Sequence, residues 1–386
     1  MTRRSRSPGA GKPSGSGPST GAWVGLLLTV AVAAAVWLFI VRPRATEPVE
    51  PVVVPAVRLD TPPAAPVPPE SSFVAARFPT DQDILRDPAT PGVFQPTASG
   101  NPMSALFGSV RFTEVGGHLV PSFHEGIDIA PLQRDARGHP LDDVHSVADG
   151  RVAYINRLTG NSNYGNYVVL LHTDPLGEVY TLYAHLATIA PGLRAGLPTP
   201  KGMVLGRMGN TATPMIPLAR AHVHFEVGVV ASANFDRWFR AQRLTPDHGN
   251  YNGWNLLAVD PRGLFRAQHA ITNFEMQVYL RTVPVAFEAV VAAPGLPDYF
   301  RRYPRLWQGA AFTRGWLVLA CSEDGVPLSG RTATPAEARL AGARRSAVLK
   351  VDEVALGRNG AHLVTKEGGA WHIGRAGERL LEILTY

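Results

Sequence analysis

The chain has 386 residues, 45% of them apolar, which is enough for two or three domains and a sizeable buried core. Its net charge of +6 comes from one end, because residues 1–21 carry four basic side chains, Arg42 and Arg44 add two, and residues 45–386 are neutral overall. This distribution argues against nucleic-acid binding, which needs basic residues on the folded part. The single cysteine, Cys321, excludes an intrachain disulfide and a structural zinc site built from several cysteines.

The first 41 residues combine a basic tail with an apolar segment. Residues 1–21 are rich in Ser, Gly, Pro and Arg and predict a disordered cytoplasmic tail. Residues 22–41 form an uncharged run of 20, the length of a transmembrane helix. More basic residues precede the run than follow it, so we predict a single-pass protein of the bacterial inner membrane with its body in the periplasm. A cleaved signal peptide is the alternative, although no clear cleavage site follows the run.

Two segments connect this anchor to the main body. Residues 42–70 are dense in proline and predict an extended, semi-rigid linker. Residues 71–105 form an N-terminal extension, in which Asp81–Arg86 predict a short helix. The extension could pack on the following domain or lie across its groove, and the sequence does not decide between these arrangements.

Residues 106–265 alternate short apolar runs with turns rich in Gly, Asn and Asp, which predicts a mainly β, compact antiparallel domain. One of these runs contains His222 and His224, whose imidazoles share a face of an extended strand. About a hundred residues earlier, His124 and Asp128 also share a face if the chain is extended. Two histidines and one aspartate around a cation, with a position left for water, are typical of a catalytic zinc site.

At these residues the chain resembles the lysostaphin-type, LytM-like zinc metallopeptidases. The resemblance covers about residues 107–265 and implies the compact antiparallel β peptidase domain of that family. It rests on several motifs in the family's order, which are Phe123–Ile129, Ala148–Val152, Tyr164–Val169, Tyr180–Leu186, Lys201–Gly202, Leu205–Gly206, Gly209–Thr211 and His222–Val227.

The resemblance implies roles for five residues. His124, Asp128 and His224 correspond to the ligands of one zinc ion. His185 and His222 correspond to the two histidines beside the metal, which handle protons and stabilise the oxyanion. The implied activity is hydrolysis of peptide bonds in peptidoglycan stem or cross-link peptides, with zinc-bound water as the nucleophile and a histidine as the general base.

Elementary chemistry agrees with these roles. Zinc lowers the pKa of bound water to about 7 and polarises a carbonyl, and a neutral histidine can take the proton of the water and give it to the leaving amine. We favour His222 as the base because it lies two residues from a ligand on the same face, although the roles of His222 and His185 could be exchanged. Glu226 shares this face and could orient a ligand, or it could be an ordinary strand-end charge.

Two segments depart from the family pattern. Residues 228–258 are an insert beside the histidine strand, with an amphipathic helix at 234–244 that we expect to form a wall of the groove. Residues 270–386 predict a mostly β accessory domain, which could bind wall polymer or a partner, or brace the peptidase. In this region a capping box at Thr334–Glu337 predicts a short helix. The strand-like runs are Glu275–Val283, Ala286–Ala292, Trp316–Cys321, His362–Lys366 and Ala370–Ile373.

Three functions compete at this point. The leading hypothesis is a membrane-anchored zinc endopeptidase that acts on peptidoglycan. The alternative is a non-catalytic regulator that activates cell-wall hydrolases with the same fold; the five intact polar residues argue against it, while a groove blocked by the insert would favour it. A peptidase of other exported peptides is the third hypothesis, and only the family resemblance favours peptidoglycan over it.

Overall fold

The computed structural model describes residues 69–386 apart from 116–117 and 246–247. The predicted tail and membrane segment, and the linker up to residue 68, lie outside the described residues. The longest helix of the described part is α7 (Arg375–Thr385) with 11 residues, and a transmembrane helix needs about 20. No helix there is both long and apolar enough to cross a membrane, which contradicts the predicted location in the inner membrane.

A seven-stranded antiparallel sheet forms the centre of residues 106–265, which confirms the mainly β prediction. β11 has neighbours on both sides. On one side β3 pairs with its residues 223–225 and β12 with 227–230, and on the other side β7 pairs with 224–228. The strand order is β12–β11–β7–β6–β5–β9, with β3 beside β11. The bounds are β3 (Ile127–Ile129), β5 (Gly150–Asn156), β6 (Tyr167–His172), β7 (Val179–Ala184), β9 (Pro198–Thr199), β11 (Val223–Val230) and β12 (Leu256–Val259).

The central strands of this sheet are buried on both faces, which explains why their sequences are almost continuously apolar. On β11, Phe225, Val227 and Val229 face the main core. The residues between them face the other side, where a second apolar cluster contains Val230 and Tyr180. The even-numbered residues of β11 therefore point to a face that carries polar side chains at one end.

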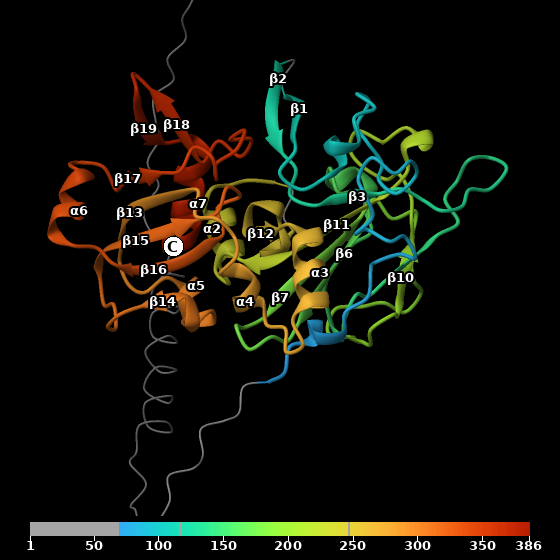
Figure 1. Ribbon diagram of the computed structural model, residues 1–386, viewed down its shortest axis with the longest axis horizontal. Helices are drawn as coiled ribbons and strands as arrows, with labels where there is room; N and C mark the ends of the chain where they lie inside the picture. The colour runs from blue at the N-terminus through green and yellow to red at the C-terminus, as the bar shows by residue number, and fades with distance from the viewer. Residues whose placement is uncertain (1–68, 116–117, 246–247) are drawn as a thin grey trace, which may run out of the picture. The chain divides into compact units, whose positions relative to one another are not determined.

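Smaller elements surround the large sheet. A three-stranded sheet has the order β4–β10–β8, and β1 and β2 form a hairpin that extends away from β3 in Figure 1. The bounds are β1 (Val110–Val115), β2 (His118–Phe123), β4 (Asp143–His145), β8 (Thr188–Ile189), β10 (Val204–Arg207), α2 (Phe235–Ala241) and α3 (Pro261–Ala270), and 3-10 turns lie at Ser72–Ala75, Pro102–Ala105, Thr159–Asn161, Leu218–Arg220, Gly249–Tyr251 and Gly253–Asn255.

The C-terminal region is built on a five-stranded sheet with the order β14–β16–β15–β13–β17, followed by the hairpin β18–β19. Four helices accompany these strands, so the prediction of a mostly β region holds only in part. The bounds are α4 (Met276–Leu280), β13 (Phe287–Ala293), α5 (Asp298–Arg302), β14 (Trp307–Gln308), β15 (Gly315–Cys321), β16 (Pro327–Thr332), α6 (Pro335–Leu340), β17 (Ser346–Val351), β18 (Val364–Glu367), β19 (Ala370–Ile373) and α7, and a 3-10 turn lies at Pro304–Leu306.

Two local predictions were wrong. The run Glu275–Val283 is not a strand but contains α4, because its buried residues Met276, Tyr279 and Leu280 recur with helical spacing. Asp81–Arg86 forms turns instead of a helix, since the Asp83 side chain accepts a hydrogen bond from the Leu85 backbone N–H at 3.0 Å. Such a side-chain bond competes with helical hydrogen bonding.

The peptidase-like and C-terminal regions share one apolar core. Phe225 and Phe265 belong to the same buried cluster as Phe300 and Leu319. The Tyr303 hydroxyl accepts a hydrogen bond from the Val230 N–H at 3.2 Å, at the end of β11. These contacts show that the C-terminal region packs against β11, the strand that carries His224. The predicted domain boundaries stay a prediction.

Candidate metal centre and adjoining groove

Backbone pairing brings the first three polar residues together. His224 on β11 is the direct partner of Asp128 on β3, so the two side chains leave the sheet on the same face. His124 lies in the short connection between β2 and β3 and reaches the same point. Gly126 allows the close approach of this connection, because a Cβ there would collide with the Phe225 carbonyl and the His224 ring.

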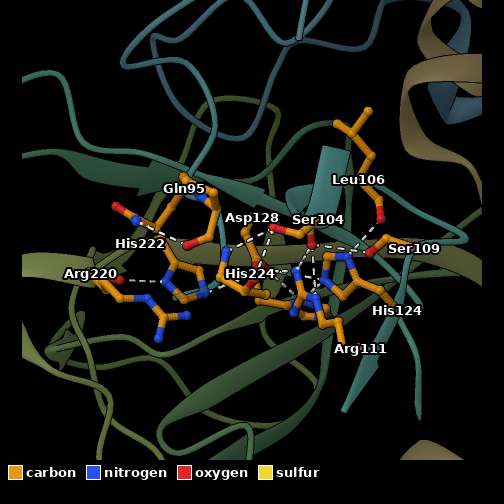
Figure 2. Close-up of polar contacts among 12 residues, drawn as sticks. Gln95, Ser104, Leu106, Ser109, Arg111, His124, Asp128, Arg220, His222 and His224 are labelled. Carbon is orange, nitrogen blue, oxygen red and sulfur yellow. Dashed lines mark hydrogen bonds and ion pairs between the residues drawn. The ribbon is translucent and has the colours of Figure 1, made fainter. Parts of the chain in front are cut away.

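Three donor atoms form a nearly equilateral triangle (Figure 2). His124 Nε2 lies 3.1 Å from His224 Nδ1 and 3.2 Å from Asp128 Oδ1, and His224 Nδ1 lies 3.0 Å from Asp128 Oδ1. Ligands of a tetrahedral zinc ion at about 2.0–2.2 Å are roughly 3.3 Å apart, so the triangle fits such an ion closely. All three side chains are buried. Among the described residues, they form a group whose donor atoms lie close enough together to hold a metal ion.

The outward-facing nitrogens of both histidines have partners of their own. His124 Nδ1 donates to the Leu106 carbonyl at 2.9 Å, which leaves Nε2 free to bind a metal. His224 Nε2 lies 2.9 Å from Glu226 Oε1, which leaves Nδ1 as the metal-facing atom. Glu226 is fully buried and also accepts hydrogen bonds from the hydroxyls of Tyr164 and Tyr180, at 2.7 and 2.9 Å. It therefore orients His224 instead of ending a strand as a solvated charge.

Arg111 on β1 contacts the third donor residue. Its guanidinium donates to Asp128 Oδ2 at 2.6 Å and to the Ser104 carbonyl at 2.6 Å. The N-terminal extension thus packs against the site. Ser104 lies in the extension and Leu106 directly follows it, and the Gln95 N–H donates to the Asp128 carbonyl at 2.9 Å.

His185 and His222 complete the cluster. His185 follows β7 directly, with a left-handed φ of 61° that is unusual for a residue other than glycine, and its ring centroid lies 4.8 Å from that of His222. His185 Nδ1 donates to the Thr211 carbonyl at 2.8 Å, and His222 Nδ1 donates to the Arg220 carbonyl at 2.7 Å. In both rings Nε2 is therefore the atom turned toward the cluster, and His222 Nε2 lies 3.4 Å from Asp128 Oδ1.

The electrostatics of the site follow from burial and from these contacts. Burial lowers the pKa of His124 to about 4 and holds that of His185 well below its usual range, so both imidazoles are neutral at pH 7. Burial alone would raise the pKa of Asp128, but His222 and Arg111 hold it well below its usual range. Burial would also lower the pKa of His224, whereas hydrogen bonds to Asp128 and Glu226 raise it to about 9. Without a metal ion His224 is therefore protonated at pH 7, and it would have to release a proton before its Nδ1 could bind zinc beside the neutral His124 and the ionised Asp128.

A cavity of about 900 Å³ adjoins the donor triangle. His124, His185 and His224 are among the residues that line it. Phe239, Leu244 and Trp254, all from the predicted insert, line another part, as expected for a wall of the groove.

All five residues singled out from the sequence meet at this one place. Sequence reasoning did not identify Arg111 or the Leu106 carbonyl, because a hairpin and a loop bring them to the site and no motif marks them. Glu226 carried a signal, namely its position two residues after His224 on the same strand face.

One comparison with known proteins falls on the same segment. Residues 122–236 match peptidase family M23. Among solved structures the chain is similar to Csd3 of Helicobacter pylori, with 28% identity over 32% of this chain and 28% of that one and a TM-score of 0.22. It is also similar to the catalytic domain of the antimicrobial peptidase lysostaphin from Staphylococcus simulans, with 20% identity over 32% of this chain and 75% of that one and a TM-score of 0.23. The chain thus spans about a quarter of the length of Csd3, and no curated protein matches it.

Proposed function

We propose, from the match of residues 122–236 to peptidase family M23, that the protein is a zinc-dependent endopeptidase acting on peptidoglycan stem or cross-link peptides. The observation that supports this proposal best is the donor triangle of His124, Asp128 and His224, whose spacing of 3.0–3.2 Å suits one zinc ion. A large cavity beside it offers room for an extended peptide.

Each of the five polar residues would have a distinct role in the reaction. His124, Asp128 and His224 would hold the ion, which when bound supplies a more acidic water molecule and a polarised scissile carbonyl. His222 presents Nε2 as a proton acceptor because its Nδ1–H is committed to the Arg220 carbonyl, so it can take the proton of the water and return it to the leaving amine. His185 is neutral with its Nδ1–H committed to Thr211, so its Nε2 accepts a hydrogen bond and holds the water in place.

The test measures zinc content and hydrolysis of purified peptidoglycan for the full chain, a His222→Ala variant and a His269→Ala control. His269 is exposed at the end of α3, and among the described residues its ring lies near that of Phe78, with centroids 6.0 Å apart. We expect one zinc ion per chain in all three proteins and new amino termini in the wall peptides, with kcat about 10²–10⁴-fold lower in His222→Ala alone.

Two results would contradict the proposal in different ways. Zinc without cleavage of any peptide by the wild-type protein would favour the regulator hypothesis. Cleavage of denatured protein substrates but not of peptidoglycan would support a peptidase and reject the wall substrate.

A further inference from the structure

One guanidinium joins two loops at the entrance to β11. Arg134 lies in the loop between β3 and β4, which is closed by an isolated bridge from Arg134 to Pro140. Its Nη1 donates to the carbonyls of Gly138 and Leu218 at 2.8 and 3.0 Å. Its Nη2 donates to the carbonyls of Ala219 and Ala221, both at 3.2 Å. All four Nη hydrogens are therefore used on backbone oxygens, and no carboxylate pairs with Arg134 in the part of the chain that the structure describes.

The turn that receives these hydrogen bonds has little stability of its own. Residues Leu218–Arg220 form a single 3-10 turn with no side-chain cap at Pro217. Such short turns have poor hydrogen-bond geometry and depend on tertiary contacts. Arg134 supplies the contacts, and its planar, forked guanidinium donates to four carbonyls at once, which an ammonium with three N–H groups cannot do.

The same turn orients the imidazole of His222. The Arg220 carbonyl accepts the Nδ1–H of His222 at 2.7 Å, and this peptide group lies between the two whose oxygens, on Ala219 and Ala221, bind Arg134 (Figure 2 shows the Arg220–His222 bond). Because each peptide is planar, holding both neighbours restricts the direction of the Arg220 carbonyl. The backbone of His222 is held separately, by its N–H bond to the Gly209 carbonyl at 2.9 Å.

We propose that Arg134 is a positioning residue for His222: it holds the 218–221 turn so that the Arg220 carbonyl keeps the His222 ring in one tautomer, with Nε2 turned to the site. The effect of this positioning on kcat rests on the proposed function. Its structural consequence, a fixed tautomer, holds whether or not the protein is a peptidase.

The test compares Arg134→Lys with Arg137→Lys in the full chain. Arg137 lies in the same loop, is exposed, and its side chain makes no hydrogen bond or ion pair with any residue the structure describes. The first readout is the ¹⁵N NMR signature of the His222 ring in metal-free protein. We expect a single Nδ1–H tautomer in wild type and in Arg137→Lys, and a mixture in Arg134→Lys, because an ammonium cannot bind four carbonyls in two loops.

The second readout separates positioning from binding. Arg134→Lys should keep one zinc ion per chain and a KM within about twofold of wild type, while kcat falls roughly 10- to 100-fold, less than on loss of the whole base. If Arg134→Lys kept the wild-type tautomer and kcat, the proposal would be overturned. Loss of zinc or of NMR dispersion in this variant would overturn it too, because Arg134 would then be a general structural residue. A tautomer mixture in a protein whose wild type cleaves nothing would support the positioning role and reject the proposed function.

Discussion

At the scale of single residues, the two metal-facing histidines differ in what holds them. His124 donates to a backbone carbonyl, whereas His224 contacts the buried carboxylate of Glu226. A carboxylate behind a ligating imidazole fixes its tautomer and increases its basicity, and the two tyrosine hydroxyls keep Glu226 in position. If the site binds zinc as proposed, its metal affinity would depend on Glu226, a residue that is not one of the three donors.

We predict that Glu226→Gln weakens zinc binding by roughly 10- to 100-fold, because a neutral amide is a poorer partner for the His224 ring. Competition with a chromogenic chelator measures this change. Glu178→Gln is the matched control, since Glu178 is a solvent-exposed residue next to β7 whose carboxylate pairs with Arg151 at 2.5 Å. Equal zinc affinity in Glu226→Gln and the control would mean that the Glu226 charge does not contribute.

At the scale of elements, the histidine strand depends on one close approach. Gly228 on β11 pairs with Ala258 on β12 and with Tyr180 on β7. A Cβ at this position would collide with the Leu257 carbonyl. Glycine is thus required where β11 and β12 lie together, four residues after His224.

Gly228→Ala should therefore lower the free energy of unfolding by at least about 2 kcal/mol, because the two strands must separate to make room. Gly160→Ala serves as the control, since no atom lies within 4 Å of a Cβ there and its φ is not left-handed. Urea denaturation of both variants measures the difference. Similar midpoints would show that the sheet accommodates the methyl group without cost.

The helix α6 carries a pH-dependent contact in the C-terminal region. Hydrogen bonds from Arg331, together with the Thr334 N–H of the capping box, lower the pKa of Glu337 from 4.5 to about 2. Since the pKa is lower in the folded protein than in the unfolded one, this contact stabilises the fold above pH 4.5. That stabilisation is lost as the pH falls toward about 2.

The unfolding free energies of wild type and Glu337→Gln should consequently differ at neutral pH and converge between pH 4.5 and about 2. Urea denaturation across this range measures the convergence. In an Arg331→Met background, the pH dependence of the Glu337→Gln effect should largely disappear. A difference that stays constant down to pH 2 would contradict the assignment.

At the scale of the whole described unit, the C-terminal region packs on the same core as the large sheet. The Tyr303 hydroxyl connects them, because it accepts from the Val230 N–H and donates to the Glu178 carbonyl at 2.8 Å. Asp324, in the turn after β15, accepts the Ala258 N–H at 3.0 Å. The C-terminal region thus contacts β11, β12 and the residue that precedes β7.

We predict that residues 106–386 unfold in one cooperative transition and that Tyr303→Phe lowers the free energy of unfolding by about 1–3 kcal/mol, since a buried N–H and a carbonyl lose their partner. Tyr386→Phe, at an exposed position, is the control. Tryptophan fluorescence and circular dichroism should give coincident curves. Two separated transitions would show that the regions are independent domains.

The sequence by itself predicted which polar residues meet at the site and the type of its central element. His222, His224, His124 and Asp128 could be predicted because strand periodicity places alternate residues on one face, and because two imidazoles and a carboxylate are a common donor set for a transition-metal ion such as zinc. The β character of residues 106–265 followed from the same local patterns, which depend only on neighbours along the chain.

Tertiary structure alone decided what surrounds those residues. Arg111 reaches the site from a hairpin and Arg134 reaches its entrance from a loop. The placement of both segments depends on packing, and the sequence does not indicate which carbonyls they bind. The helical character of α4 and the shared core of the C-terminal region were likewise settled by burial against distant residues. Local patterns record which face of an element is apolar, whereas long-range contacts determine what that face meets.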